Sequence, residues 1–225
     1  PAGNDGTSSA RKTLSAAAGE TPVLDFSAQS ENSANRGLQL MASFWHVSGI
    51  TVQHAGDNGI YVGGSNNIVE RVVTAFNHDT GLQLGRATST TPQSQWPANN
   101  LIISSESHDN RDSGGENADG FASKLTTGSG NVFRYDVSHN NIDDGWDLFT
   151  KTDTGPIGPV TIDQCISYEN GTLGWQAPKG DGARGGGEDL TDIYLEDVGG
   201  SGIYGYSAPD PQPDAIICTL HAQLD

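Results

Sequence analysis

Four aspartates in two segments of the sequence have the chemistry of a metal site. They are Asp119, Asp143, Asp144 and Asp147. Asp119 and Asp144 each precede a glycine, and those glycines are 25 residues apart. Carboxylates gathered on one wall would repel one another unless a hard cation held them, and Ca²⁺ accepts about six to eight oxygen ligands. We interpret the four as a calcium site; the alternative is an acidic turn cluster that stays in water.

The spacing of these aspartates belongs to a repeat. Four segments consist of a glycine followed by alternating apolar and variable residues, and the glycines are Gly59, Gly81, Gly120 and Gly145. This alternation is typical of a strand with one buried face. Recurrence at intervals such as 22 and 25 residues, without helical periodicity, predicts an all-β solenoid, a parallel β-helix. In it, Asp119 lies one coil from Asp144.

A second family of apolar segments precedes these turns. Its members are 50–52, 68–73, 101–103, 132–137 and 160–166. Corners rich in His, Asp and Asn lie between the two families, and stacked asparagines there would form amide ladders. The corner histidines are His54, His78, His108 and His139. Because they recur, we interpret them as structural ladder residues and not as catalytic ones.

One interval of the repeat is longer than the others. Gly81 and Gly120 are 39 residues apart, and the excess is a Pro- and Ser-rich excursion over 88–99. Loops inserted into solenoid coils often lie on the binding face. Trp96 in this loop would either stack on a sugar ring or act as a hydrophobic plug that holds the loop down.

The composition fits one solenoid domain over residues 1–225, with 30 glycines and few runs of helix formers. We expect regular coils over about 40–171 and an irregular part over 172–225. The start shows no recognisable first cap, which indicates a fragment. Cys165, in an apolar strand, is expected to be a small buried residue, although pairing with Cys218 is the alternative.

The net charge of −17 constrains the partners. Nucleic acid and anionic membranes would be repelled, so neither is expected as a partner, and no apolar run reaches membrane-spanning length. An acidic polysaccharide would bind only if divalent cations bridged the two. Low lysine content with abundant Ser, Thr, Asn and Gly suits a secreted, extracellular protein, and we expect a monomer.

Three segments carry a resemblance to a known family: 117–125 (NADGFASKL), 131–134 (NVFR) and 143–148 (DDGWDL). They resemble the calcium-site region of the family 9 polysaccharide lyases, the PelX/PelL-type pectate lyases, over roughly residues 40–171. The resemblance implies a right-handed, single-stranded parallel β-helix, secretion, and calcium-dependent β-elimination of polygalacturonate. It also implies that calcium is bound by Asp119, Asp143, Asp144 and Asp147.

The elimination needs a base for the C5 proton of the uronate as well as a metal beside its carboxylate. In the family, a lysine from an NGFKLG-like motif beyond the aspartates serves. This sequence departs from that motif, because 179–190 reads KGDGARGGGEDL. The candidate bases, in falling order, are Arg184, Lys179 and Lys124, although a guanidinium pKa above about 12 demands an unusual environment.

Lys124 is also a candidate for binding the substrate. Alternation predicts that Leu125 lies on the buried face of its strand and that Lys124 points outward on the wall that carries Asp147. There Lys124 would bind a substrate carboxylate or remain solvated.

Two classes of function follow. The first is a secreted lyase acting on pectate, or on another uronate polymer such as rhamnogalacturonan. The second is a catalytically silent, calcium-stabilised β-helix that serves as a carbohydrate-binding or adhesin-like module, since fold alone does not decide function.

Overall fold

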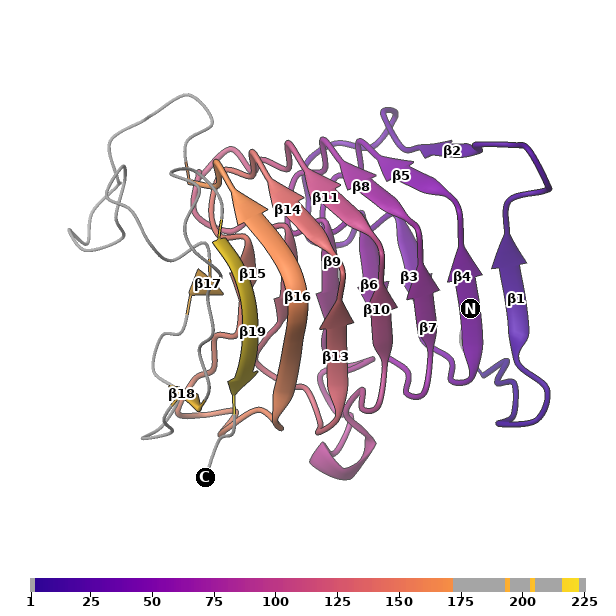
Figure 1. Ribbon diagram of the computed structural model, residues 1–225, viewed down its shortest axis with the longest axis vertical. Coiled ribbons are helices and arrows are strands. Elements are labelled where there is room, and N and C mark those ends of the chain that lie inside the picture. The colour runs from indigo at the N-terminus through magenta and orange to yellow at the C-terminus, as the bar shows by residue number, and fades with distance from the viewer. Residues whose placement is uncertain (1–2, 172–192, 195–202, 205–215, 223–225) are drawn as a thin grey trace.

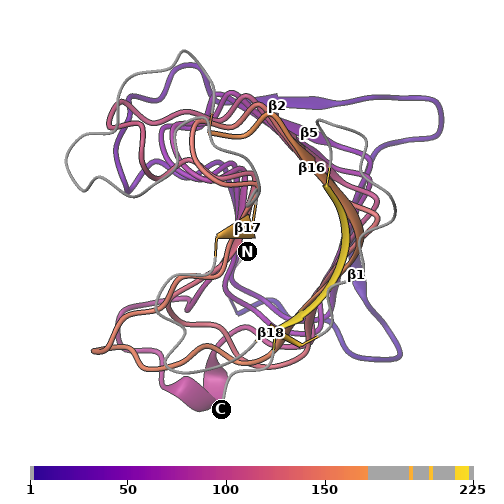
Figure 2. The ribbon, with the colours of Figure 1, turned by 60° about the vertical axis from the view of Figure 1, so that its left-hand side comes forward.

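The chain forms a parallel β-helix, as the sequence predicts. The computed structural model describes residues 3–171, 193–194, 203–204 and 216–222. Strands of successive coils lie side by side along the axis in Figure 1, and Figure 2 shows the coils superposed around a common core. Within these described ranges, no helix is long and apolar enough to cross a membrane.

The strands form two sheets. The 13-stranded sheet consists of β1 (Lys12–Ser15), β2 (Val23–Asp25), β4 (Trp45–Ser48), β5 (Thr51–Gln53), β7 (Ile68–Glu70), β8 (Val73–Ala75), β10 (Leu101–Ile103), β11 (Glu106–His108), β13 (Asn131–Arg134), β14 (Val137–His139), β16 (Val160–Tyr168), β18 (Ile203–Tyr204) and β19 (Ile216–Ala222). The 6-stranded sheet consists of β3 (Leu38–Leu40), β6 (Ile60–Val62), β9 (Leu82–Leu84), β12 (Phe121–Ser123), β15 (Trp146–Asp147) and β17 (Ile193–Tyr194). Parallel pairing begins at β1 and therefore extends upstream of residue 40.

Apolar side chains stack in columns between the two sheets. One column consists of Ile60, Leu82, Phe121 and Trp146, which are consecutive register partners and fully buried. The rings of Phe121 and Trp146 stack with their centroids 5.1 Å apart. Cys165 is buried in the same core, as expected for a small apolar residue. The predicted register of the glycine-led segments is thus confirmed.

Two of the predicted strands are each divided in two. Residues 68–73 include β7 and the start of β8, with Arg71 between them, and residues 132–137 include most of β13 and the start of β14, with Tyr135 between them. Arg71 and Tyr135 have left-handed backbone, with φ of 49° and 58°, which turns the chain. The prediction of one continuous strand was wrong in both places. The apolar residues continue on both sides of a bend this short, so the sequence pattern does not reveal the bend.

Buried asparagines join successive coils at the corners. One column consists of Asn77, Asn110, Asn141 and Asn170, and each Nδ2 in it donates to the Oδ1 of the next at 2.8 Å. The Oδ1 atoms also accept a backbone N–H from the neighbouring coil, for example Asn77 to Asn110 at 3.1 Å. A second column includes Asn100 and Asn131, joined at 3.0 Å. The predicted amide ladders are confirmed, and they satisfy polar groups that water does not reach.

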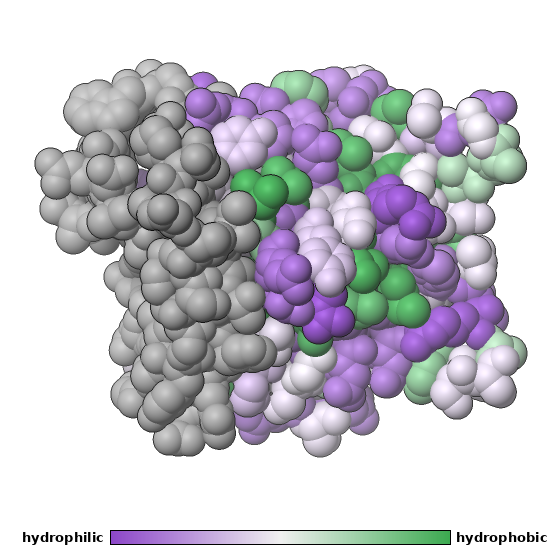
Figure 3. Space-filling model, viewed as in Figure 1, coloured by the Kyte–Doolittle hydropathy of each residue, from purple (hydrophilic) through white to green (hydrophobic). Residues whose placement is uncertain are grey.

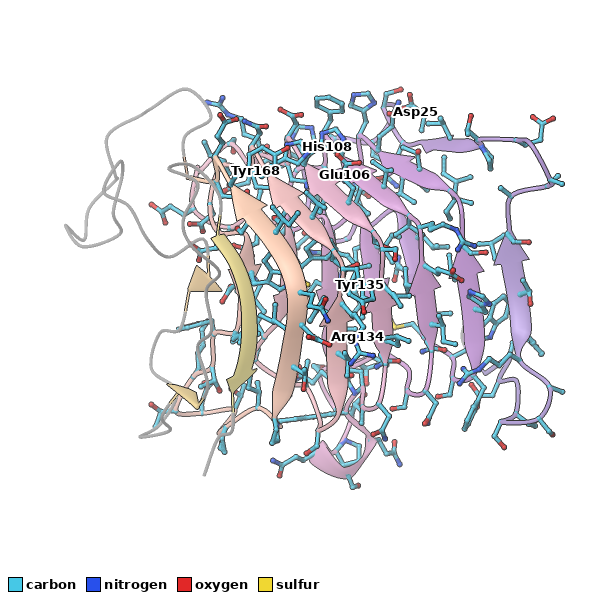
Figure 4. All side chains as sticks on the ribbon, viewed as in Figure 1. Asp25, Glu106, His108, Arg134, Tyr135 and Tyr168 are labelled. Carbon is cyan, nitrogen blue, oxygen red and sulfur yellow. The ribbon has the colours of Figure 1, made fainter. Side chains whose placement is uncertain are left out.

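Aromatic and histidine rings form a ladder along one edge of the 13-stranded sheet, where Figure 4 labels His108 and Tyr168. His108 stacks on His139 with centroids 5.0 Å apart, and His139 stacks on Tyr168 at 4.7 Å. His54 stacks on Phe76 at 5.6 Å. The ladder prediction is confirmed for these three histidines. The face below the ladder is mostly hydrophilic with small apolar patches (Figure 3).

The inserted segment 88–99 leaves the stack as a loop with one 3₁₀ turn, η1 (Gln93–Gln95), seen at the lower edge of Figure 1. Trp96 is only 7% exposed, and its Nε1 donates to the carbonyl of Thr91 at 3.4 Å. Its buried ring favours the plug over the sugar-stacking alternative.

Candidate metal centre and adjoining groove

The turns that lead into the 6-stranded sheet position the predicted metal residues. Asp119 and Asp144 precede β12 and β15, and the N–H of Gly120 donates to the carbonyl of Asp144 at 2.8 Å. The two aspartates are therefore one coil apart, as the repeat predicts. A Cβ added at Gly120 would lie 1.9 Å from Oγ of Ser138, so only glycine lets this turn lie against the neighbouring corner.

Three of the four predicted ligands come together. Asp119, Asp143 and Asp144 each offer a carboxylate oxygen, and these oxygens lie within 4.8 Å of one another. Oδ1 of Asp119 also accepts the backbone N–H of Asp144 at 3.3 Å. The structure thus gathers the oxygens in one place; that they bind a metal stays a prediction.

The fourth, Asp147, is linked to this cluster through Lys124. Nζ of Lys124 lies 2.7 Å from Oδ2 of Asp119 and 2.9 Å from Oδ2 of Asp147. Oδ2 of Asp119 also accepts from the Thr80 hydroxyl at 2.7 Å, and Oδ1 of Asp147 accepts from the Phe149 N–H at 2.7 Å. The lysine is an internal counter-ion here, with only 11% of its side chain exposed. We call Lys124 and the four aspartates the acid cluster.

Burial and crowding perturb the groups of the acid cluster. Burial raises the pKa of Asp119, and Lys124 offsets this only in part. Burial, together with repulsion from Asp119 and Asp143, raises the pKa of Asp144. Burial alone would lower the pKa of Lys124, but the carboxylates of Asp119 and Asp147 raise it well above its usual value. The cluster therefore contains more carboxyl groups than one ammonium group can keep in the charged form.

The donor set fits a hard divalent cation. All the candidate ligands are carboxylate oxygens, which Ca²⁺ prefers, and the raised pKa of Asp144 shows that its charged form lacks compensation. A divalent ion between these oxygens would supply that compensation. Asp119, Asp143 and Asp144 would hold the ion directly, and Asp147 would join them if its ammonium partner moved.

The two leading candidates for the base, Arg184 and Lys179, lie outside the described residues. Lys124 is the candidate that the structure places, and the high pKa imposed by its two carboxylates keeps its ammonium protonated. This protonation disfavours Lys124 as a base in the ion-free protein.

A groove of about 540 Å³ adjoins the acid cluster. Its lining includes Arg36, Tyr61, Arg86, Leu125, Thr126 and Lys151. The prediction that Leu125 is buried on the core face was wrong, because β12 ends at Ser123 and Leu125 has left-handed backbone with φ of 65°. Sequence reasoning also missed Arg36, Arg86 and Lys151 as candidate site residues. The sequence has only 11 Lys and Arg residues, so each of them could have been considered as a candidate.

The protein is thus a parallel β-helix whose outer wall carries clustered carboxylates beside a groove with three basic residues. The family described as "Pel9A-like, right handed beta helix region" matches residues 2–193. The chain belongs to this family of right-handed β-helix proteins, the family 9 polysaccharide lyases, and the predicted handedness is thereby confirmed.

Individual relatives agree with this assignment. "Pectate lyase L" of Paenibacillus polymyxa (strain SC2) is 59% identical over 170 residues, which cover 75% of this chain and 38% of the relative. "Pectate lyase L" of Thermoclostridium stercorarium is 51% identical over 172 residues, which cover 76% and 14%. The solved structure titled "Crystal structure of pectate lyase Pel9A" has a TM-score of 0.67 at 30% identity, covering 78% of this chain and 42% of that one. The chain therefore spans less than half the length of each of these relatives.

Proposed function

We propose that this chain carries the metal-binding part of a secreted, calcium-dependent pectate lyase that cleaves polygalacturonate by β-elimination. The observation that supports this most strongly is the acid cluster itself, which lies on an outer wall in a chain 59% identical to a pectate lyase. In the reaction a base takes the C5 proton of a uronate, the C4–O bond breaks, and a C4–C5 double bond forms. The departing sugar oxygen gains a proton.

Calcium bound to the four aspartates would neutralise the uronate carboxylate beside C5 and lower the energy of the charge that develops there. Hydrogen bonds within the chain orient two of these carboxylates. Thr80 and the N–H of Asp144 hold Asp119, and the N–H of Phe149 holds Asp147. Lys124 balances part of the charge, and once displaced by the ion its ammonium would be free to bind a substrate carboxylate.

Calorimetry with Ca²⁺ tests the metal site. Asp144→Ala should lower calcium affinity by about 100-fold or more, because it removes a ligand whose charge needs the ion. Asp109→Asn, in the bend that follows β11, is the matched control and should bind like the parent. Equal affinity for Asp144→Ala and the parent would place the calcium elsewhere.

The base is proposed to be Arg184, followed by Lys179 and then Lys124. Removal of the true base should lower turnover by orders of magnitude and leave calcium affinity nearly unchanged, because a base acts in the transition state. The measurement is steady-state elimination on polygalacturonate for each alanine variant, followed through the ultraviolet absorbance of the unsaturated product. Full activity in all three variants would rule out this choice.

The second candidate function is a catalytically silent, calcium-stabilised carbohydrate-binding module. The departure from the family's lysine motif at 179–190 favours it. Calcium binding without any calcium-dependent elimination in the parent would establish this reading. Elimination on rhamnogalacturonan but not on polygalacturonate would instead identify a lyase for another uronate polymer.

A further inference from the structure

The groove beside the acid cluster gathers basic side chains on a strongly acidic protein. The chain has a net charge of −17, yet Arg36, Arg86 and Lys151 all line this one groove. They come from three different coils, so only the stacking of the solenoid brings them together. A polyanion approaching this protein is repelled by most of its surface, and this groove is where attraction would replace repulsion.

The side chain of Arg36 is held in place by neighbouring groups. Nε of Arg36 donates to Oδ2 of Asp57 at 3.1 Å, and its guanidinium lies over the ring of Tyr61 at 3.6 Å from the centroid. The Tyr61 hydroxyl donates to the carbonyl of Arg86 at 3.1 Å. A guanidinium has five N–H donors, so Arg36 retains others beyond the one given to Asp57.

The other two cations share the groove with one carboxylate, that of Asp153. Among the described residues, neither the guanidinium of Arg86 nor the ammonium of Lys151 forms a salt bridge. The backbone of Arg86 is fixed by its N–H bond to Oγ1 of Thr126 at 3.0 Å. Lys151 is exposed, at the edge of the groove.

The groove continues directly from the acid cluster. Four consecutive register partners lie on the outer side of the 6-stranded sheet: Tyr61, Gln83, Ala122 and Asp147. Parallel strands are about 4.8 Å apart, so Tyr61 lies roughly 14 Å from Asp147 along the axis. Leu125 lines the groove and directly follows Lys124 of the cluster. A linear ligand with one sugar at the cluster would extend its neighbours into the groove.

We propose that Arg36, Arg86 and Lys151 bind the carboxylates of the uronates that neighbour the sugar at the acid cluster, and so select for unesterified polymer. The inference rests on the proposed function for the class of substrate. The planar guanidinium of arginine donates two parallel hydrogen bonds to the two oxygens of a carboxylate. A methyl ester carries no charge, and its methylated oxygen is a poor acceptor.

The test measures binding separately from elimination. A short oligogalacturonate is titrated into the parent and into Arg86→Gln and Lys151→Met in the presence of Ca²⁺, and the ultraviolet absorbance of the unsaturated product is followed to establish that the ligand stays intact during the titration. Each variant should bind about tenfold more weakly, and its affinity should depend less on salt. Arg71→Gln, an exposed arginine on the other sheet, is the matched control and should bind like the parent. Thermal unfolding of each variant establishes that it is folded.

A second measurement uses a methyl-esterified oligomer of the same length. The parent should bind it more weakly than the free acid, and the groove variants should not weaken it further. Parent-like binding of the free acid by both groove variants would overturn the assignment. If binding depends on the groove but the parent shows no elimination with Ca²⁺, the proposed lyase activity fails and the groove assignment stands.

Discussion

Lys124 shows how strongly a single residue depends on its neighbours here. In sequence it is a lysine after a short strand; in the structure its ammonium bridges Asp119 and Asp147, with 11% of the side chain exposed. It therefore holds together two coils whose carboxylates would otherwise repel. We expect its role to change when calcium binds here, because the ion and the ammonium would compensate the same charges.

Replacing Lys124 with methionine should destabilise the calcium-free protein by ~3–5 kcal/mol, the cost of leaving buried charges without their partner. Saturating calcium should restore much of that loss, because the ion then balances the carboxylates. Chemical denaturation with and without Ca²⁺ measures both effects. Lys151→Met, an exposed lysine, is the control and should change stability by less than ~0.5 kcal/mol. A loss that calcium leaves unchanged would contradict the counter-ion role.

A pH effect is expected at Asp57, beside the groove. Burial, with repulsion from Asp79, raises the pKa of Asp57 to about 6, although Arg36 offsets part of the rise. A carboxyl whose folded pKa is raised favours folding below its unfolded value of about 4, and that contribution is lost as pH rises through about 6. Asp57→Asn does not titrate, so its melting temperature should fall less than that of the parent between pH 4 and 7. Parallel curves in a calorimetric pH series would refute this, and Asp109→Asn serves as the control.

The stability of each strand and corner depends on the repetition of that strand or corner in the neighbouring coils. Strands of three or four residues have little stability alone, and each depends on its partners one coil away. The asparagine columns fix the corners in register because each amide uses both its donor and its acceptor within the stack.

Asn110→Ala should destabilise the protein by roughly 2–4 kcal/mol, because it leaves both the backbone N–H and the Nδ2 of Asn77 without their buried acceptor. Asn140→Ala is the matched control: its side chain is partly exposed at the same type of corner, and the change should cost less than ~1 kcal/mol. Denaturant unfolding compares the two. Equal losses would show that the ladder adds nothing to stability.

At the scale of the whole molecule, the β-helix transmits effects mainly to adjacent coils. Each coil contacts its neighbours, so stability behaves as a sum of coil and interface contributions. The acid cluster joins the coils of β12 and β15, which lie far along the stack from β4 and β5 (Figure 1).

Calcium should therefore slow amide hydrogen exchange locally. The N–H of Phe121, bonded to the carbonyl of Gly145 at 3.0 Å, should gain the most protection. The N–H of Thr51, bonded to the carbonyl of Pro22 at 2.9 Å, should change little. Exchange measured by mass spectrometry or NMR with and without Ca²⁺ decides this, and uniform protection along the chain would contradict it.

Sequence reasoning alone predicted the β-helix, the register of the glycine-led strands, the asparagine ladders and the coil spacing of Asp119 and Asp144. It could do so because these features recur along the chain, and each coil repeats the same alternation and corner chemistry. The positions of residues outside the repeat became clear only from the three-dimensional arrangement of the coils. The bends at Arg71 and Tyr135 depend on backbone angles that apolar periodicity does not encode. The pairing of Lys124 with Asp119 and Asp147, and the meeting of Arg36, Arg86 and Lys151, depend on side chains of separate coils that become neighbours only when the coils stack.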